Sequence, residues 1–224
     1  MPLQSNLKLQ LNRMHECPLG YGSSRFGIWL QGCNLACPGC CSRDTWGIGP
    51  RHDVPWSFFA ATLEFSLSAK PLNGITISGG EPFLQKAALT ALVREIRAIQ
   101  GRLGTDWDIL LYTGYRFEEI AACTDILNEV DMLVAGPYDV ALPKTDLRGS
   151  SNQTLHWLTD CGRSRYSEAW LTGSGQDNSL SLAIAGNDLV WAGLPHQEDL
   201  PRLEKMLQVR GFDLGDVSWR GHRG

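Results

Sequence analysis

The sequence lacks a long uninterrupted apolar run. No segment of its 224 residues approaches the roughly 20 apolar residues that a membrane-spanning helix needs. Residues 1–10 also lack a charged stretch followed by an apolar one, which argues against a secretory signal peptide. We therefore expect a cytoplasmic protein with no membrane partner, in a compartment where thiols stay reduced.

An excess of positive charge is missing as well. The chain has 20 Lys and Arg against 24 Asp and Glu, which gives a formal net charge of −4. Nucleic-acid binders usually present a basic face, so the balance of charge argues against a nucleic-acid partner. Internal repeats and low-complexity tracts are absent, and the composition is that of an ordinary globular protein. The length predicts one domain with at most a small appendage.

Cysteine is distributed unevenly. Seven cysteines are present, and four of them lie between Cys33 and Cys41. A secreted disulfide framework has an even number of cysteines spread along the chain, so ligation of a metal or a cluster is the better interpretation. The spacing Cys33-x3-Cys37-x2-Cys40 provides three thiolates on one loop. They can bind three irons of a cubane cluster and leave the fourth iron open for a small molecule.

Two other interpretations of these cysteines stay open. Zinc usually takes four ligands in two closely spaced pairs, and the chain has no second pair of this kind. One of the remaining cysteines or of the five histidines could still supply a fourth ligand. Cys41 follows Cys40 directly and would point in another direction, so we interpret it as a free thiol.

Strands and helices are expected to alternate along the first two-thirds of the chain. Such alternation predicts βαβ units and a mainly parallel sheet, with functional loops at the carboxyl ends of the strands. The cysteine loop, the segment 78–82 and the turn at Thr113-Gly114 each follow a predicted strand, so we expect them to face one pocket. The apolar patterns place strands at 7–11, 26–30, 74–77, 107–112 and 132–134, and helices at 55–69, 84–100 and 118–130.

The pattern changes after residue 160. Segments 180–185 and 188–192 predict two strands joined at Gly186-Asn187 as a hairpin. Segment 198–210 predicts an amphipathic helix that ends at Gly211. We expect a core over residues 1–160 and a C-terminal accessory extension over residues 161–224. The extension caps the open side of the core or docks a protein substrate, and we favour capping.

Two motifs of this chain resemble the signature motifs of the radical S-adenosylmethionine (SAM) superfamily. They are the cysteine loop and Ser78-Gly79-Gly80-Glu81-Pro82. Over residues 10–158 the chain further resembles the activating component of anaerobic (class III) ribonucleotide reductase. The matching segments are Leu30–Cys33, Cys37–Cys40, Asp44–Trp46, Tyr112–Tyr115 with Glu118-Glu119, Val134–Tyr138 and Arg148–Gln153.

The resemblance implies an α/β fold, a partial (β/α) barrel of radical SAM type, here with a small C-terminal α+β extension. It implies that Cys33, Cys37 and Cys40 bind a [4Fe–4S] cluster whose open iron is chelated by SAM. The segment Ser78–Gly80 would admit the methionine moiety, and Glu81 would fix this loop or meet the SAM amino group. The backbone from Gly39 to Cys41 would meet the adenine. Thr113 would lie near the ribose or the methionyl end.

The implied reaction is reductive cleavage of SAM to methionine and a 5′-deoxyadenosyl radical, which abstracts a hydrogen atom. The protein substrate would be a glycyl radical enzyme, and the electron would come from a reduced flavodoxin or a ferredoxin-type donor. The residues beyond 160 depart from this family and leave the substrate open. One alternative is a stand-alone radical SAM enzyme that modifies a peptide, a protein side chain or a nucleoside. Another is a non-catalytic iron–sulfur or zinc binding module.

Overall fold

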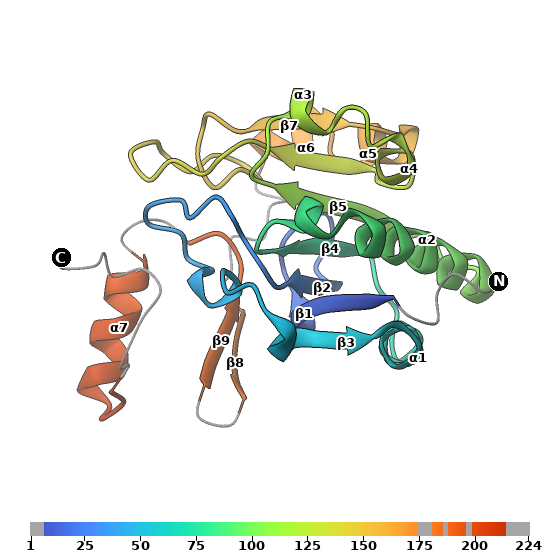
Figure 1. Cartoon of the computed structure of the whole chain (residues 1–224). Helices are drawn as coiled ribbons and strands as arrows, with labels where there is room; N and C mark the ends of the chain where they lie inside the picture. The colour runs from blue at the N-terminus through green and yellow to red at the C-terminus, as the bar shows by residue number, and fades with distance from the viewer. Residues whose placement is uncertain (1–6, 174–180, 186–187, 196–198, 214–224) are drawn as a thin grey trace.

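A seven-stranded sheet organises the protein in this computed structural model, which describes residues 7–173, 181–185, 188–195 and 199–213 (Figure 1). The strand order is β3-β1-β2-β4-β5-β6-β7. The strands are β1 (Lys8–Cys17), β2 (Arg25–Leu30), β3 (Asp53–Pro55), β4 (Gly74–Gly79), β5 (Asp108–Thr113), β6 (Met132–Ala135) and β7 (Thr154–Trp157).

The four central strands of the sheet, β2, β4, β5 and β6, are parallel to their neighbours in this set, as the alternating pattern predicted. Strands β1, β3 and β7 pair antiparallel at the two edges. The five predicted strands are confirmed, whereas β3 and β7 were not predicted. The fold is therefore mixed α/β, with the carboxyl ends of four parallel strands along one edge.

Two long helices cover one face of the sheet. Helix α1 (Trp56–Ser68) and helix α2 (Lys86–Leu103) bury their apolar stripes against alternate residues of the parallel strands. Ile28, Ile77 and Leu111 are fully buried in this core. Each such side chain contributes roughly 1.5–3 kcal/mol by leaving water. Short 3-10 helices precede the long ones: η2 (Arg43–Thr45), η3 (Pro50–His52) and η4 (Pro82–Gln85).

The single helix predicted over residues 118–130 is wrong. The chain forms two short helices there, α3 (Phe117–Ile120) and α4 (Thr124–Leu127). Between them the Cys123 amide donates to the Ile120 carbonyl, three residues back, as in a tight turn. The apolar spacing survives this break because Ile120 and Ile126 both point into the core, so periodicity alone did not reveal it.

A buried ion pair closes the other face at the amino ends of the parallel strands. Arg25 on β2 donates from its two terminal nitrogens to both carboxylate oxygens of Asp108 on β5, each at 2.9 Å. Both side chains are fully buried. The Tyr166 hydroxyl donates to the same carboxylate at 2.5 Å, and Arg165 donates to it at 3.0 Å. Residues from α5 (Asp160–Arg165) and just beyond it therefore complete the core network of the sheet.

The C-terminal region continues with α6 (Glu168–Thr172), the hairpin strands β8 (Ser181–Ala185) and β9 (Asp188–Ala192), and α7 (Asp199–Val209). The predicted hairpin and helix are both present, and β8 pairs antiparallel with β9. The predicted turn at Gly186-Asn187 lies outside the described residues. Figure 1 shows the hairpin and α7 on the same side of the molecule as the loop that follows β2. The division into a core of residues 1–160 and an extension stays a prediction.

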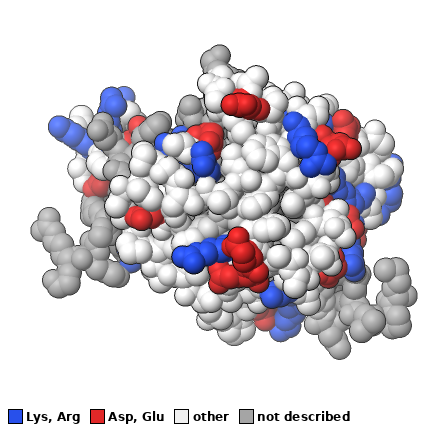
Figure 2. All heavy atoms as spheres, turned by 90° about the horizontal axis from the view of Figure 1, so that it is seen from above, with Lys and Arg blue, Asp and Glu red and all other residues white. Residues whose placement is uncertain are grey.

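Charge on the surface is mixed. On the face shown in Figure 2, acidic and basic side chains lie next to one another instead of gathering by sign. No basic patch forms on the part of this face that the structure describes. Among the described residues, no helix has both the length and the apolar character needed to cross a bilayer.

Candidate functional site

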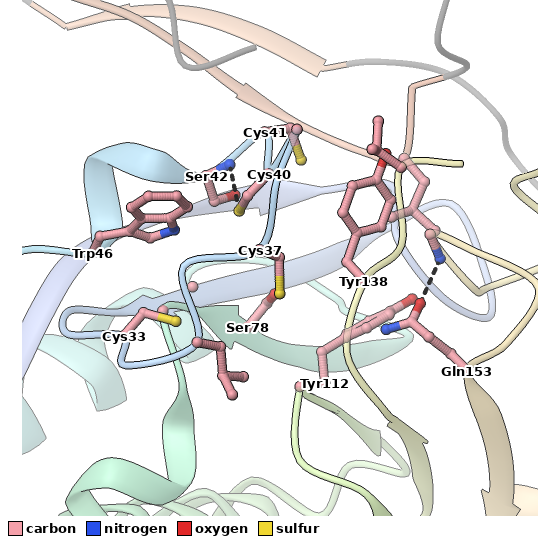
Figure 3. A pocket seen from close by; sticks show the side chains of 18 of the residues that line it. Cys33, Cys37, Cys40, Cys41, Ser42, Trp46, Ser78, Tyr112, Tyr138 and Gln153 are labelled. Atoms are coloured by element: carbon pink, nitrogen blue, oxygen red, sulfur yellow. Dashed lines mark hydrogen bonds between the residues drawn. The ribbon is translucent and has the colours of Figure 1, made fainter. Parts of the chain in front are cut away.

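A cavity of about 360 Å³ opens at the carboxyl ends of the parallel strands (Figure 3). It brings together nine of the ten residues that the sequence singled out, drawn from the loops after β2, β4 and β5. They are Cys33, Cys37, Gly39, Cys40, Cys41, Ser78, Gly79, Gly80 and Thr113. The expectation that these three loops share one pocket is thereby confirmed.

The cysteine loop is closed on itself by backbone hydrogen bonds. The Gly32 amide donates to the Thr45 carbonyl at 2.7 Å, and the Cys33 amide donates to the Trp46 carbonyl at 3.1 Å. Within the loop, the Cys40 amide donates to the Cys37 carbonyl at 3.1 Å. These bonds bring both ends of the loop together at the sheet edge, so its three spaced cysteines face one cavity, as Figure 3 shows.

The thiols of the loop differ in their surroundings. Burial raises the pKa of Cys37 and of Cys40, while the Ser42 amide, 3.4 Å from the Cys40 sulfur, acts in the opposite direction. Burial and the adjacent Cys40 raise the pKa of Cys41 to about 12. The interpretation of Cys41 as a thiol that does not bind the cluster stays a prediction.

The donor set suits a cluster better than a single ion. Within the part of the chain that the structure describes, no three His, Cys, Asp or Glu side chains converge closely enough to hold one metal ion. Zinc needs such convergence, since its ligands meet at one point. In a cubane each thiolate binds a different iron, so three thiols spaced around one cavity fit that group.

Glycines at the end of β4 let the cysteine loop lie against the strand. A Cβ on Gly79, whose φ is +119°, would lie 2.3 Å from the backbone nitrogen and oxygen of Leu30. A Cβ on Gly80 would lie 2.1 Å from the Gly32 carbonyl oxygen. A Cβ atom cannot lie so close to backbone atoms, so these close approaches account for glycine at both positions. They also fix the cysteine loop relative to Ser78.

Glu81 fixes a second wall of the cavity, the turn at Thr113-Gly114, without itself lining the cavity. Its side chain is fully buried. The Gly114 amide and the Thr113 hydroxyl donate to its carboxylate, each at 2.8 Å, and the Phe83 amide donates at 2.9 Å. Burial raises the pKa of Glu81, and these hydrogen bonds oppose the rise. Glu81 was expected either to fix its loop or to meet the SAM amino group, and these hydrogen bonds fix the loop to Thr113 and Gly114. A contact with SAM stays a prediction.

The segment Arg148–Gln153 forms a turn that its own side chains hold together. Arg148 pairs with Asp146 at 2.6 Å and donates to the Gln153 carbonyl at 3.3 Å. The Gln153 amide nitrogen donates to the Gly136 carbonyl at 2.8 Å, and its oxygen accepts from the Gly149 amide at 2.9 Å. Gln153 thereby joins this turn to the end of β6 beside the cavity.

Several lining residues were not identified from the sequence. Trp46 is half-buried and faces the cavity, and its indole lies beside the Cys40 sulfur. Four apolar residues of the C-terminal region were also missed, since their spacing looks like ordinary core packing. The remaining residues that the sequence did not identify are Leu35, Ser42, Tyr112, Gly136, Tyr138, Val140, Gly149, Gln153, Leu194, Pro195, Leu200 and Pro201.

Three thiols on one loop, at the carboxyl ends of parallel strands, define an iron–sulfur enzyme with an α/β fold. Comparison with known proteins agrees. Residues 19–156, more than half of the chain, match the family described as "4Fe-4S single cluster domain". The chain is also 31% identical over 157 residues to the anaerobic ribonucleoside-triphosphate reductase-activating protein of Enterobacteria phage T4. That alignment covers 68% of this chain and 96% of the phage protein.

Bacterial relatives extend the comparison. The protein of the same name from Escherichia coli K12 is 31% identical over 148 residues, covering 60% of this chain and 89% of that protein. The pyruvate formate-lyase-activating enzyme of Streptococcus mutans is 23% identical over 210 residues, which cover 88% of this chain and 74% of that enzyme. The chain belongs to the family of anaerobic ribonucleoside-triphosphate reductase-activating proteins. It is a radical SAM enzyme of the activating type, with a [4Fe–4S] cluster and SAM as cofactors.

Proposed function

We propose that this protein activates a glycyl radical enzyme by placing a radical on a glycine of that partner. The single observation that carries the proposal is the cavity in which Cys33, Cys37 and Cys40 face the loops after β4 and β5. The names of the relatives support it, because they describe proteins that activate an anaerobic reductase or a formate lyase.

The cysteines are proposed as the three protein ligands of the cluster, which leaves one iron for SAM. With both cofactors bound, the cluster supplies an electron that cleaves SAM and yields a radical able to remove hydrogen from the substrate. The cavity volume of about 360 Å³ lies at the lower end of the range for small-molecule sites, which suits one cofactor molecule.

The chain's own residues bind, orient and exclude water. The backbone of Gly39–Cys41 is proposed to meet the adenine, and the loop Ser78–Gly80 to receive the methionine moiety. Thr113, held by Glu81, is proposed to lie near the ribose or the methionyl end. These parts are fixed to one another by backbone contacts, so the site is preorganised before the cofactor binds.

Wider features of the proposal follow the same family. The sheet and its helices are proposed to form a partial (β/α) barrel of radical SAM type, which the C-terminal extension caps. The electron donor is proposed to be a reduced flavodoxin or ferredoxin-type protein. We place the reaction in the cytoplasm, where the seven cysteine thiols stay reduced.

The test is anaerobic reconstitution with iron and sulfide, reduction, and measurement of 5′-deoxyadenosine formed from SAM. Cys33→Ala, Cys37→Ala and Cys40→Ala should each abolish the product, whereas Cys41→Ala, the matched control on the same loop, should retain it. A glycyl radical signal in the partner after incubation would identify the substrate. The proposal is wrong if the reconstituted wild-type protein forms no 5′-deoxyadenosine, or if the Cys41 variant loses activity like the other three.

A further inference from the structure

The C-terminal region contributes one side of the cavity. Leu194 and Pro195, just after β9, line the same space as Cys40 and Cys41. So do Leu200 and Pro201 in the first turn of α7. These four apolar side chains, here called the C-terminal wall, come from the part of the chain farthest in sequence from the cysteine loop.

The C-terminal wall is held at both ends by burial. Ala192, at the end of β9, is only 2% exposed and packs with Cys17 and Trp29 on the inner face of β1 and β2. Leu200 is 6% exposed. The burial of Ala192 before the wall and of Leu200 within it keeps the wall beside the cysteine loop.

Lys144 contacts the C-terminal wall at Leu194. Its ammonium group donates to the Leu194 carbonyl at 2.6 Å. Burial lowers the pKa of Lys144, and the charge of Asp199, at the start of α7, opposes this lowering. Lys144 is half-buried and belongs to the segment between β6 and β7. The hydrogen bond therefore ties this segment to the first part of the wall.

The C-terminal wall lies beyond the part of the chain that the 4Fe-4S single cluster domain family matches. The matching family ends at residue 156, and the phage relative is covered over 96% of its length by only 68% of this chain. The wall offers apolar side chains and two prolines, which have no N–H to donate. Its contribution to the cavity is therefore to exclude water and narrow the space, and the polar contacts come from the other loops.

We propose that Lys144 is a positioning residue that holds the C-terminal wall against the cysteine loop, so that the wall shields the cavity and keeps SAM in place. The identity of the ligand rests on the proposed function, whereas the existence of the wall does not.

The test compares Lys144→Met and Lys144→Arg with the wild-type holoenzyme. Methionine keeps the length of the side chain but removes the donor, and arginine restores it. The first readout is the rate at which iodoacetamide alkylates Cys41, measured by peptide mass spectrometry relative to Cys123, which lies far from the cavity. The second readout is the split between KM for SAM and kcat for 5′-deoxyadenosine. Lys8→Met is the matched control, because it removes an exposed lysine paired with Asp53 on the surface.

Lys144→Met should raise the alkylation rate of Cys41 relative to Cys123 by about tenfold, the factor expected for loss of one hydrogen bond from a charged donor. KM for SAM should rise by a similar factor while kcat changes less. Lys144→Arg should return both values toward those of the wild type, and Lys8→Met should leave them unchanged. Leu200→Ala, which trims the wall directly, should also expose Cys41.

Three results would overturn the inference. The first is an unchanged rate of Cys41 alkylation in both Lys144→Met and Leu200→Ala. The second is an equal rise in the alkylation rates of Cys41 and Cys123, which would mean that the whole fold has loosened and not the wall alone. The third is an unchanged KM in a Lys144→Met protein that still cleaves SAM. A wild-type protein that binds no cluster would contradict the proposed function, but the two alkylation rates would still report on the wall.

Discussion

Replacing Glu81 with glutamine tests how the second wall of the cavity is held. The carboxylate accepts hydrogen bonds from the Phe83 amide and the Thr113 hydroxyl on one oxygen, and from the Gly114 amide on the other. Glutamine keeps one oxygen, which can retain the first two bonds. Its NH₂ group takes the place of the second oxygen and turns donors toward the Gly114 N–H. The substitution therefore removes one buried hydrogen bond and leaves a backbone amide without an acceptor.

The magnitude follows from that single loss. A hydrogen bond to a charged acceptor contributes roughly 1.5–3 kcal/mol, and a buried unsatisfied donor costs about as much as the bond it has lost. We expect Glu81→Gln to lower the free energy of unfolding by about 2 kcal/mol. Glu64→Gln is the matched control. Its carboxylate pairs with Arg102 at the surface and is 46% exposed, so the expected loss is below about 0.5 kcal/mol.

The assay is urea denaturation of the reduced, cluster-free chain, with the midpoint compared at an unchanged m-value. The reasoning also predicts a pH dependence. Burial raises the pKa of Glu81 above its usual 4.5, so the stabilisation by this group is full below that pH and falls as pH rises through the raised pKa. Glutamine does not titrate, so the gap between the two proteins should narrow as pH rises. A Glu81→Gln protein as stable as the wild type at every pH would refute this account of the loop.

Three further predictions concern other parts of the structure. Arg25→Met removes the fully buried partner of Asp108, which keeps only its bonds from Arg165 and Tyr166, and should lower the free energy of unfolding by about 3 kcal/mol in urea denaturation; a loss below about 1 kcal/mol would contradict the buried ion pair. Gly80→Ala should reduce the iron bound per chain after reconstitution, because its Cβ would displace the cysteine loop at Gly32. Gly101→Ala is the control, since it has open space around it and should bind as much iron as the wild type. Equal iron contents in the two variants would contradict the close approach of Gly80 to Gly32. Burial lowers the pKa of His15, so the stability that neutral His15 contributes is present above pH 6.5 and is lost as pH falls through the lowered pKa. His15→Gln should therefore lose less stability than the wild type on acidification from about pH 7 to about pH 5, as measured by thermal unfolding. Equal changes of melting temperature with pH in the two proteins would contradict this.

The positions of the three site loops could be predicted from the sequence because each depends on local patterns. A short apolar run followed by Cys33, by Ser78 or by Thr113 marks the end of a strand, and parallel strands end at the same edge. The β8–β9 hairpin was predictable for the same reason, since its turn signal and its strands are adjacent in the sequence.

Features that depend on distant pairs were not predictable in this way. Arg25 and Asp108 each look like polar residues at the start of a strand, and nothing local indicates that they meet. Tyr166 joins them from another element. Leu200 has the spacing of any residue on the apolar face of a helix, so periodicity could not separate core packing from the lining of a cavity. Glycines 79 and 80 line the cavity as expected, but their close approach to the backbone of Leu30 and Gly32 could be seen only in the fold.

Because the C-terminal wall is synthesised after the cysteine loop, the cavity is completed only late in translation. During translation the cysteines leave the ribosome long before Leu194 and Leu200, which are among the last described residues to appear. A nascent chain released as far as β7 already has every strand of the large sheet, yet one side of its cavity is still open to the surrounding solution. The cysteine loop is therefore more accessible to solvent in the nascent chain than in the finished protein, where the wall covers that side.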